Sequence, residues 1–166
     1  MTGLVIAKLD RGHATDAFDC GDASLNRFLG QHALQNQLAN AAQTYVCVEG
    51  SRIIGYATLA VGAVSHGEAP ERLRKGLARF PVPVMVLARL AVDRGWQGRG
   101  VGASLLKDMA LRTVQSANIA GIRALIIHAK DEAARDYYRQ FGFSEGFPDP
   151  LHMHVLTKEL ISLAAG

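Results

Sequence analysis

The feature that most constrains the fold of this chain is an apolar run followed at once by closely spaced glycines. Residues 84–92 read VMVLARLAV, the near-continuous apolar pattern of a strand covered on both faces. Gly98, Gly100 and Gly102 follow, and glycine lets the backbone bend sharply or lets a ligand approach closely. Apolar residues then recur at helical spacing. The segment therefore predicts a buried strand, a glycine-rich turn and a helix that begins near Gly100 to Gly102.

This strand, turn and helix form the local structure that holds phosphate groups in many proteins. The first turn of a helix presents backbone N–H groups without intrahelical partners, together with the positive end of the helix dipole. Gln97 and Arg99 add polar donors beside the turn. The segment is thus a candidate anion site built from backbone groups.

Other interpretations of these glycines explain less of the segment. A turn without a ligand leaves the alternating glycines unexplained. Gly98-x-Gly100-x-x-Ala103 matches a loose dinucleotide fingerprint, but no βαβ unit precedes it and no acidic residue follows at the required distance. The Walker pattern fails because the chain contains no Gly-Lys-Ser or Gly-Lys-Thr.

The length of 166 residues and a hydrophobic content of 49% suit one domain over residues 1–166. No apolar run is long enough for a membrane-spanning helix, and the charged start of the chain does not resemble a signal peptide. Cys20 and Cys47 form neither a disulfide framework nor a zinc motif. We expect a protein of the reducing cytoplasm, with Cys47 as a small core residue.

Hydrophobic periodicity predicts alternating strands and helices along the chain. The order is β, α, β-hairpin, central β, glycine loop, α, β, α, β, β, which predicts an α/β (α+β) fold with a mixed sheet and helices on both faces. The expected elements are strands at 4–9, 44–49, 52–61, 84–92, 123–129, 143 onward and 151–156, and helices at 23–35, 71–77, 102–114 and 131–140.

A second group of residues follows the strand at 123–129. It reads Asp131-x-x-Ala134-x-x-x-Tyr138-x-x-x-Gly142-Phe143. By themselves, Tyr137 and Tyr138 are aromatic residues of a short helix, and packing alone would explain them.

Together, the two groups resemble the GNAT superfamily of N-acetyltransferases. Gln97-Gly98-Arg99-Gly100-Val101-Gly102 has the form of its pyrophosphate loop, and the group at 131–143 differs from the family pattern only in Asp131, where the family has asparagine. The resemblance implies a GNAT fold whose central strand and 123–129 strand splay apart around the pantetheine arm of acetyl-coenzyme A (acetyl-CoA). The implied cofactor-binding residues are Leu90, Ala91, Val92, Gln97, Gly98, Arg99, Gly100, Val101, Gly102, Ala103, Asp131, Ala134 and Tyr138.

The resemblance also implies that Tyr138 is the catalytic residue, with its hydroxyl facing the coenzyme sulfur. Amine attack on a thioester forms an oxyanion and expels a thiolate. A phenol with a pKa of about 10 can protonate a leaving thiolate whose thiol has a pKa of about 8.5, and a backbone N–H of the central strand can stabilise the oxyanion.

Further stretches resemble one branch of this superfamily, the acetyltransferase toxins of bacterial toxin–antitoxin pairs. They are the segment 18–29, Thr44-Tyr45-Val46, the segment 81–93 and Ile127-His128-Ala129. The resemblance implies acetylation of the free α-amine of aminoacyl-tRNA, which blocks translation. It also implies a ribbon-helix-helix antitoxin as partner. The sequence leaves open whether the chain forms a homodimer.

Charge is concentrated beside the glycine loop. Between Glu68 and Arg99 the chain has seven basic and three acidic residues, whereas its total net charge is +3. A pyrophosphate would account for an arginine in the loop but not for the whole group, so we interpret the segment as an RNA-backbone contact. The candidate RNA-binding residues are Arg72, Arg74, Lys75, Arg79 and Arg89.

Two alternative functions remain open at this point. One is acetylation of a small amine or of a protein N-terminus, and the other is a non-catalytic module that binds coenzyme A. We interpret His66 and His128 as structural residues first, and His152 and His154 as one exposed face of a late strand. No carboxylate cluster has metal-ligand spacing, so no metal is predicted.

Overall fold

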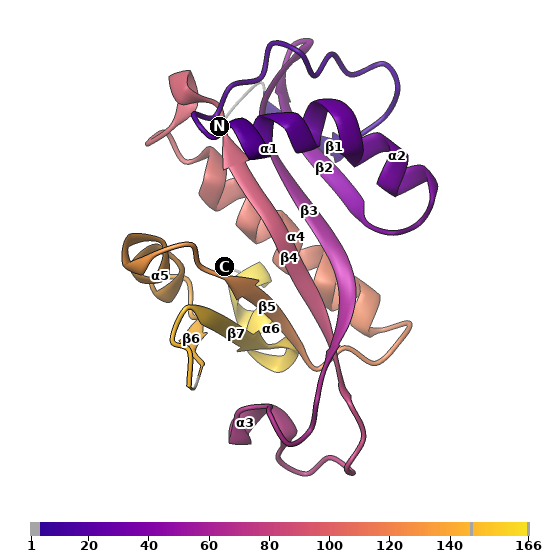
Figure 1. Cartoon of the computed structure of the whole chain (residues 1–166), viewed down its shortest axis with the longest axis vertical. Coiled ribbons are helices and arrows are strands. Elements are labelled where there is room, and N and C mark those ends of the chain that lie inside the picture. Colours follow the sequence, from indigo (N-terminus) through magenta and orange to yellow (C-terminus); the bar gives the residue numbers. More distant parts are fainter. Residues whose placement is uncertain (1–3, 147, 166) are drawn as a thin grey trace. The chain divides into compact units, whose positions relative to one another are not determined.

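The computed structural model describes residues 4–146 and 148–165. Its strands belong to one mixed sheet, as the sequence predicted, and their order in the sheet is β1-β2-β3-β4-β5-β7-β6 (Figure 1). The strands are β1 (Leu4–Lys8), β2 (Gln43–Glu49), β3 (Arg52–Val64), β4 (Val82–Val92), β5 (Ala124–His128), β6 (Ser144–Glu145) and β7 (His152–Leu156). The helices are α1 (Ala23–Arg27), α2 (Ala33–Leu38), α3 (Glu71–Arg74), α4 (Val101–Ala117), α5 (Glu132–Arg139) and α6 (Thr157–Ala165).

The chain divides into two compact units, and β3, β4 and α4 each contribute to both. The first contains the residues up to Ala60 together with Ala88–Met109, and the second contains Val61–Leu87 and Ala110–Gly166. The single domain over residues 1–166 and the helices on both sheet faces stay predictions.

The first unit is built on the antiparallel strands β1, β2 and β3. Figure 1 shows α1 and α2 lying across these strands. Asp22 caps α1 by accepting from the backbone N–H groups of Ser24 and Leu25. A π-helical turn, Phe28–His32, joins α1 to α2 and places Phe28 and Leu29 in the same buried cluster as Tyr56 of β3. The apolar face predicted for this helix is therefore confirmed.

The pairing of β2 with β3 is irregular next to Gly55, and the start of α4 lies close to this glycine. The register shifts between Cys47 and Val48, opposite Gly55, which confirms the irregularity that glycine predicted there. A Cβ placed on Gly55 would lie 2.9 Å from Cγ1 of Val101 and 3.0 Å from Cδ1 of Leu105. Only glycine at this position allows α4 to pack so near β3.

The second unit is built on β5, which pairs in parallel with the start of β4 and antiparallel with β7. One buried cluster contains Leu73 of α3, Val84 of β4, Ala124 of β5 and Leu156 of β7. The short strand β6 pairs with β7, and Arg139 of α5 forms an ion pair with Glu145 of β6. These contacts position α5, which carries the tyrosines.

The prediction that His152 and His154 form one exposed face is wrong for His154. The His152 side chain is 56% exposed, whereas His154 is 3% exposed. Both residues lie on the same face of β7, but Arg72 reaches this face beside His154. Arg72 forms an ion pair with Glu159 and a hydrogen bond with Ser144, and Ser144 is the cross-strand partner of His154.

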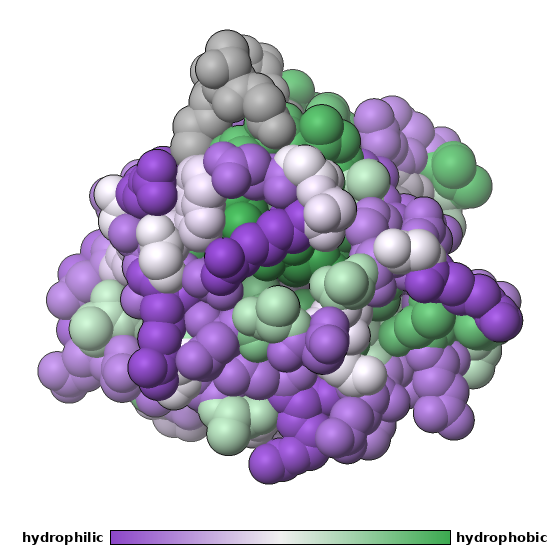
Figure 2. All heavy atoms as spheres, turned by 90° about the horizontal axis from the view of Figure 1, so that it is seen from above, coloured by the Kyte–Doolittle hydropathy of each residue, from purple (hydrophilic) through white to green (hydrophobic). Residues whose placement is uncertain are grey.

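Hydrophilic residues cover most of the face that Figure 2 shows from above. Within residues 4–146 and 148–165, no helix combines the length and apolar character needed to cross a bilayer. Cys47 is buried at 1% exposure, which confirms its prediction as a core residue.

Candidate active site

The glycine-rich loop in the first unit has the backbone conformation that its sequence requires. Gly98 and Gly100 have φ values of 75° and 87°, in the left-handed region that favours glycine. The first α-helical hydrogen bond runs from the Ser104 N–H to the Gly100 carbonyl, and α4 begins at Val101. A Cβ on Gly98 would meet no atom within 4 Å. The loop therefore leads directly into a helix N-terminus and leaves space beside Gly98.

A buried carboxylate holds the start of this loop. Asp93 is 3% exposed, and its side chain accepts from the N–H of Gly95 at 3.0 Å and from the N–H of Asp19 at 3.2 Å. Arg52 forms an ion pair with the same carboxylate at 3.4 Å. Asp93 thus ties the loop to two other segments of the first unit, a role that the sequence analysis missed.

The side chains of Gln97 and Arg99 brace the loop. Gln97 Nε2 donates to the Val92 carbonyl at 2.9 Å and to the Cys20 carbonyl at 3.1 Å. Arg99 donates to the Gly95 carbonyl at 3.2 Å, and its guanidinium lies 4.0 Å from the Trp96 ring centroid. The backbone N–H groups, rather than the Gln97 amide, are therefore the candidate phosphate donors.

Strand pairing changes along the central strand. The parallel ladder joins Val84–Leu87 of β4 to Ala124–Ile127 of β5. From Leu87, β4 continues for five residues to Val92, whereas β5 ends at His128, one residue after its last paired residue. The three predicted cofactor residues Leu90, Ala91 and Val92 form the last part of β4, beyond the ladder. The predicted divergence of the two strands stays a prediction.

The second unit carries Tyr138 on α5. Asp131 caps the helix by accepting from the Ala134 N–H at 2.8 Å, so the aspartate at this position has a structural role. Gly142, with a φ of 95°, follows the helix, as the sequence predicted. The group at 131–143 therefore forms one short capped helix and its exit turn.

Tyr138 is half-buried, and its hydroxyl is available to a ligand. Its ring packs edge-on against Phe143 with the centroids 5.8 Å apart. Its hydroxyl forms no hydrogen bond with residues 4–146 or 148–165. Burial, and then the neighbouring Tyr137, raise the pKa of Tyr138 to about 12. The hydroxyl thus stays protonated at neutral pH and keeps a free proton to donate.

Tyr137 has a different environment on the same helix. Its ring packs against Phe141 with the centroids 5.1 Å apart, and burial raises the pKa of Tyr137. The two tyrosines touch each other edge-on at 5.4 Å between centroids. Tyr137 is therefore a suitable control for changes at Tyr138.

His128 stacks on His152 at the end of β5. The ring centroids are 3.9 Å apart and the rings are nearly parallel, at 7°. Burial, and then the charge of His152, lower the pKa of His128. Both rings line a cavity of about 680 Å³ whose other walls include Val86, Ile126 and Leu73. The sequence analysis treated His128 as a structural residue and predicted neither its stacking on His152 nor the cavity beside it.

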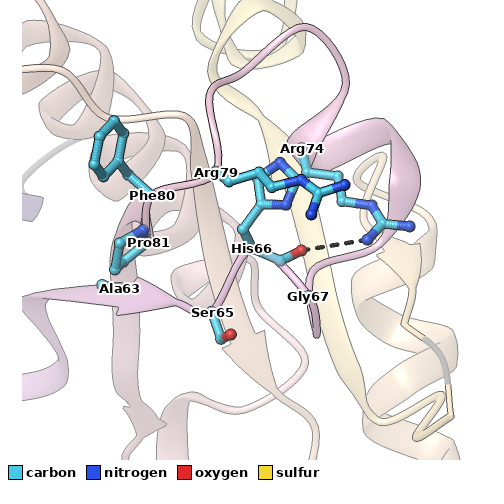
Figure 3. A pocket seen from close by; sticks show the side chains of 8 residues that line it. All are labelled: Ala63, Ser65, His66, Gly67, Arg74, Arg79, Phe80 and Pro81. Atoms are coloured by element: carbon cyan, nitrogen blue, oxygen red, sulfur yellow. Dashed lines mark hydrogen bonds between the residues drawn. The ribbon is translucent and has the colours of Figure 1, made fainter.

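The candidate RNA-binding residues have different local surroundings. Arg72 is paired with Glu159. The Arg89 guanidinium lies over the Phe28 ring, 3.6 Å from its centroid, in the first unit. Arg74 and Arg79 line a common cavity of about 720 Å³ (Figure 3), and Lys75 lines a separate one beside Arg123. Arg74 and Arg79 thus line the same cavity, whereas Arg72 and Arg89 have other partners.

Within residues 4–146 and 148–165, no group of three metal-ligating side chains occurs.

Comparisons with known proteins identify a family and several similar proteins. Residues 40–145 match the acetyltransferase (GNAT) domain model. The chain is 41% identical to a tRNA-acetylating toxin of Mycobacterium tuberculosis (strain ATCC 25618 / H37Rv). The similarity extends over 147 residues, which are 89% of this chain and 88% of the toxin.

Two solved structures of the toxin AtaT are also similar. AtaT complexed with acetyl-methionyl-tRNAfMet has a TM-score of 0.88 and 26% identity, covering 96% of this chain and 98% of the other. A tyrosine-to-phenylalanine mutant of AtaT, bound to the C-terminus of the antitoxin AtaR and acetyl-CoA, has a TM-score of 0.83 and 25% identity over 99% of both chains.

Proposed function

Because this chain belongs to the GNAT acetyltransferase family, we propose that it is a toxin that acetylates aminoacyl-tRNA. The acetyl group passes from acetyl-CoA to the free α-amine of the amino acid, and the product can no longer serve in translation. The observation that carries this proposal is the identity of 41% over 89% of the chain to a tRNA-acetylating toxin.

The glycine-rich loop is assigned to the coenzyme pyrophosphate. Bound acetyl-CoA supplies an activated acetyl thioester, and the residues of the first unit fit its phosphates. The N-terminus of α4 offers backbone N–H groups and a positive dipole end, and the open space beside Gly98 admits a phosphate. Asp93 and Gln97 hold the loop in this shape without occupying that space.

Tyr138 is assigned as the proton donor to the leaving sulfur. Its pKa of about 12 makes it a weaker acid than an exposed tyrosine at about 10. Proton transfer to a thiolate in water would therefore be unfavourable, but a sulfur held in the same desolvated surroundings is also a stronger base. The hydroxyl acts first as a hydrogen-bond donor and releases its proton as the carbon–sulfur bond breaks.

The basic residues of the second unit are assigned to the RNA. Arg74, Lys75 and Arg79 have no ion-pair partner among residues 4–146 and 148–165, so their charge is available to phosphates. Arg72 and Arg89 contribute less in this assignment because each already has a partner. Since aminoacyl-tRNA is used in the cytoplasm, the reaction takes place there.

The second proposed partner is a ribbon-helix-helix antitoxin that holds the enzyme inactive. The AtaT structure with the C-terminus of its antitoxin supports this assignment. Co-expression of the small open reading frame beside the gene tests it. Growth arrest that persists while that second protein is present and soluble contradicts the pairing.

A comparison of acceptors tests the proposed activity against its alternatives. Initial rates of acetyl transfer are measured with charged tRNA, with the same tRNA after deacylation and with the free amino acid. The proposal predicts a high rate with charged tRNA alone. Equal efficiency with the free amino acid indicates a small-amine acetyltransferase, and acetyl-CoA binding without transfer to any acceptor indicates a binding module.

A further inference from the structure

The cavity shown in Figure 3 is lined by two arginines that have no ion-pair partner in the part of the chain that the structure describes. It is lined by Ser65, His66, Arg74, Arg79, Phe80 and Pro81, together with Ala63 and Gly67. In Figure 3 the side chains of Arg79, His66 and Arg74 lie along the same wall of the cavity. Arg74 donates to the His66 carbonyl at 3.4 Å, which fixes its position without removing its charge.

The two arginines of this cavity differ from other arginines in the second unit. Arg72, on the same helix as Arg74, is paired with Glu159. Arg123 donates to the backbone carbonyls of Leu73 and Lys75. Arg74 and Arg79 line a cavity whose lining residues include no acid, and like charges in one cavity repel one another. An anion bound between the two guanidiniums removes that repulsion, and arginine favours phosphate because of its planar fork of donors.

The same cavity also exposes an aromatic ring. Phe80 is 72% exposed, and Figure 3 shows it projecting from the opposite side of the chain to Arg79. Exposed aromatic rings beside cationic side chains form the stacking platforms of proteins that bind single-stranded nucleic acid. The volume of about 720 Å³ lies in the range of about 300 to 1,000 Å³ that small-molecule sites occupy.

We propose that this cavity, the Arg74–Arg79 pocket, binds one unpaired nucleotide of the RNA substrate. Arg74 and Arg79 hold its phosphate, and its base stacks on Phe80. A fully paired RNA end offers no free base face for Phe80, so the pocket selects a single-stranded part of the RNA. The inference rests on the proposed function, because it specifies how the same RNA is held.

Three variants test the pocket, with two exposed residues as controls. Phe80→Ala removes the ring, Phe80→Trp keeps a stacking surface and Arg79→Ala removes one phosphate contact. Val61→Ala changes another exposed apolar residue, which is 78% exposed, and Lys8→Ala removes an exposed cation of β1. Thermal unfolding of each variant confirms that it is folded.

The affinity for fluorescently labelled single-stranded RNA is measured by anisotropy at several salt concentrations, with a fully paired RNA of equal length as reference. Phe80→Ala weakens single-stranded binding by roughly tenfold, the effect of losing one stacked base. It leaves the salt slope and the duplex affinity unchanged, and Phe80→Trp restores binding. Arg79→Ala lowers the salt slope by about 0.7, the value for one phosphate contact on a single strand.

Two results overturn the inference. One is single-stranded binding by Phe80→Ala and Arg79→Ala that equals binding by Val61→Ala and Lys8→Ala. The other is unchanged RNA binding by these variants together with lost neutralisation by the antitoxin, which assigns the pocket to a protein partner. If the unmodified enzyme acetylates charged tRNA in either case, only the pocket is wrong. If it does not, the proposed function itself fails.

Discussion

Gly55 of β3 lies so close to Val101, the first residue of α4, that a Cβ on the glycine would be 2.9 Å from Val101 Cγ1. The Ala91 carbonyl lies 3.2 Å from the same position. The backbone contact sets how near the helix N-terminus, with its candidate phosphate donors, can lie to β3. The spacing depends on a residue far from the glycine-rich loop in sequence.

Gly55→Ala therefore disturbs the loop although it lies outside it. We expect a loss of stability of about 1–3 kcal/mol from overpacking, and a weaker acetyl-CoA affinity because α4 must shift. Denaturant unfolding and calorimetry measure the two effects. Gly121→Ala is the control, since a Cβ there meets no atom within 4 Å. Equal behaviour of the two variants contradicts the close-contact argument.

Asp93 provides a second test of loop positioning. Asp93→Ala leaves the N–H groups of Gly95 and Asp19 without their acceptor, which we expect to cost about 1–3 kcal/mol. Acetyl-CoA affinity should fall as well, and Asp16→Ala, at an exposed position, should leave both properties unchanged. Retention of full coenzyme affinity by Asp93→Ala shows that the carboxylate does not position the loop.

Tyr138→Phe removes the free hydroxyl and keeps the ring on Phe143. Turnover should fall by roughly 10²-fold, within the range for general acid catalysis, with little change in acetyl-CoA affinity. Steady-state rates with charged tRNA measure the effect, and Tyr137→Phe should change them much less. Near-normal turnover of Tyr138→Phe removes the proposed proton donor.

The raised pKa of Tyr138 also predicts how the reaction rate depends on pH. A donor loses activity only as pH approaches its own pKa, which for Tyr138 is about 12. The rate with a pH-stable small amine acceptor should therefore show no loss attributable to Tyr138 up to about pH 10, the ordinary tyrosine value. A fall in rate near pH 10 that disappears in Tyr138→Phe means that the hydroxyl is more exposed in the working enzyme.

The stacked His128 and His152 rings predict a loss of stability in acid. The pKa of His128 is lowered from 6.5, so the unfolded chain binds a proton more readily than the folded one. This contribution to stability is complete above pH 6.5 and is lost as pH falls toward the folded-state pKa. Urea unfolding at a series of pH values should show a smaller acid loss for His128→Gln than for the unchanged protein. An identical acid loss, with His32→Gln as the exposed control, shows that His128 does not contribute.

Local sequence patterns identified the parts of the fold that depend on near neighbours. The glycine-rich loop, the start of α4, the Asp22 cap and the exit from α5 at Gly142 all follow from residues within a few positions. The candidate catalytic residue Tyr138 came instead from the resemblance of the group at 131–143 to the GNAT superfamily.

Features that depend on distant contacts could not be predicted in this way. Asp93 binds the N–H of Asp19, 74 residues away, and Arg72 binds Glu159, 87 residues away. The two-residue period of β7 gave the correct face for His154 but not the Arg72 contact that accompanies its burial. The basic segment likewise looked continuous, because its sequence does not show which arginines have partners.

The central claim is that the acetyl group is joined to the α-amine of an amino acid attached to tRNA. The most direct measurement incubates the purified protein with acetyl-labelled acetyl-CoA and charged tRNA, then releases the amino acid with mild base and identifies it by mass spectrometry. The account predicts labelled N-acetyl amino acid from the unchanged protein and far less from Tyr138→Phe. Label found on the RNA itself, on the protein or nowhere contradicts it.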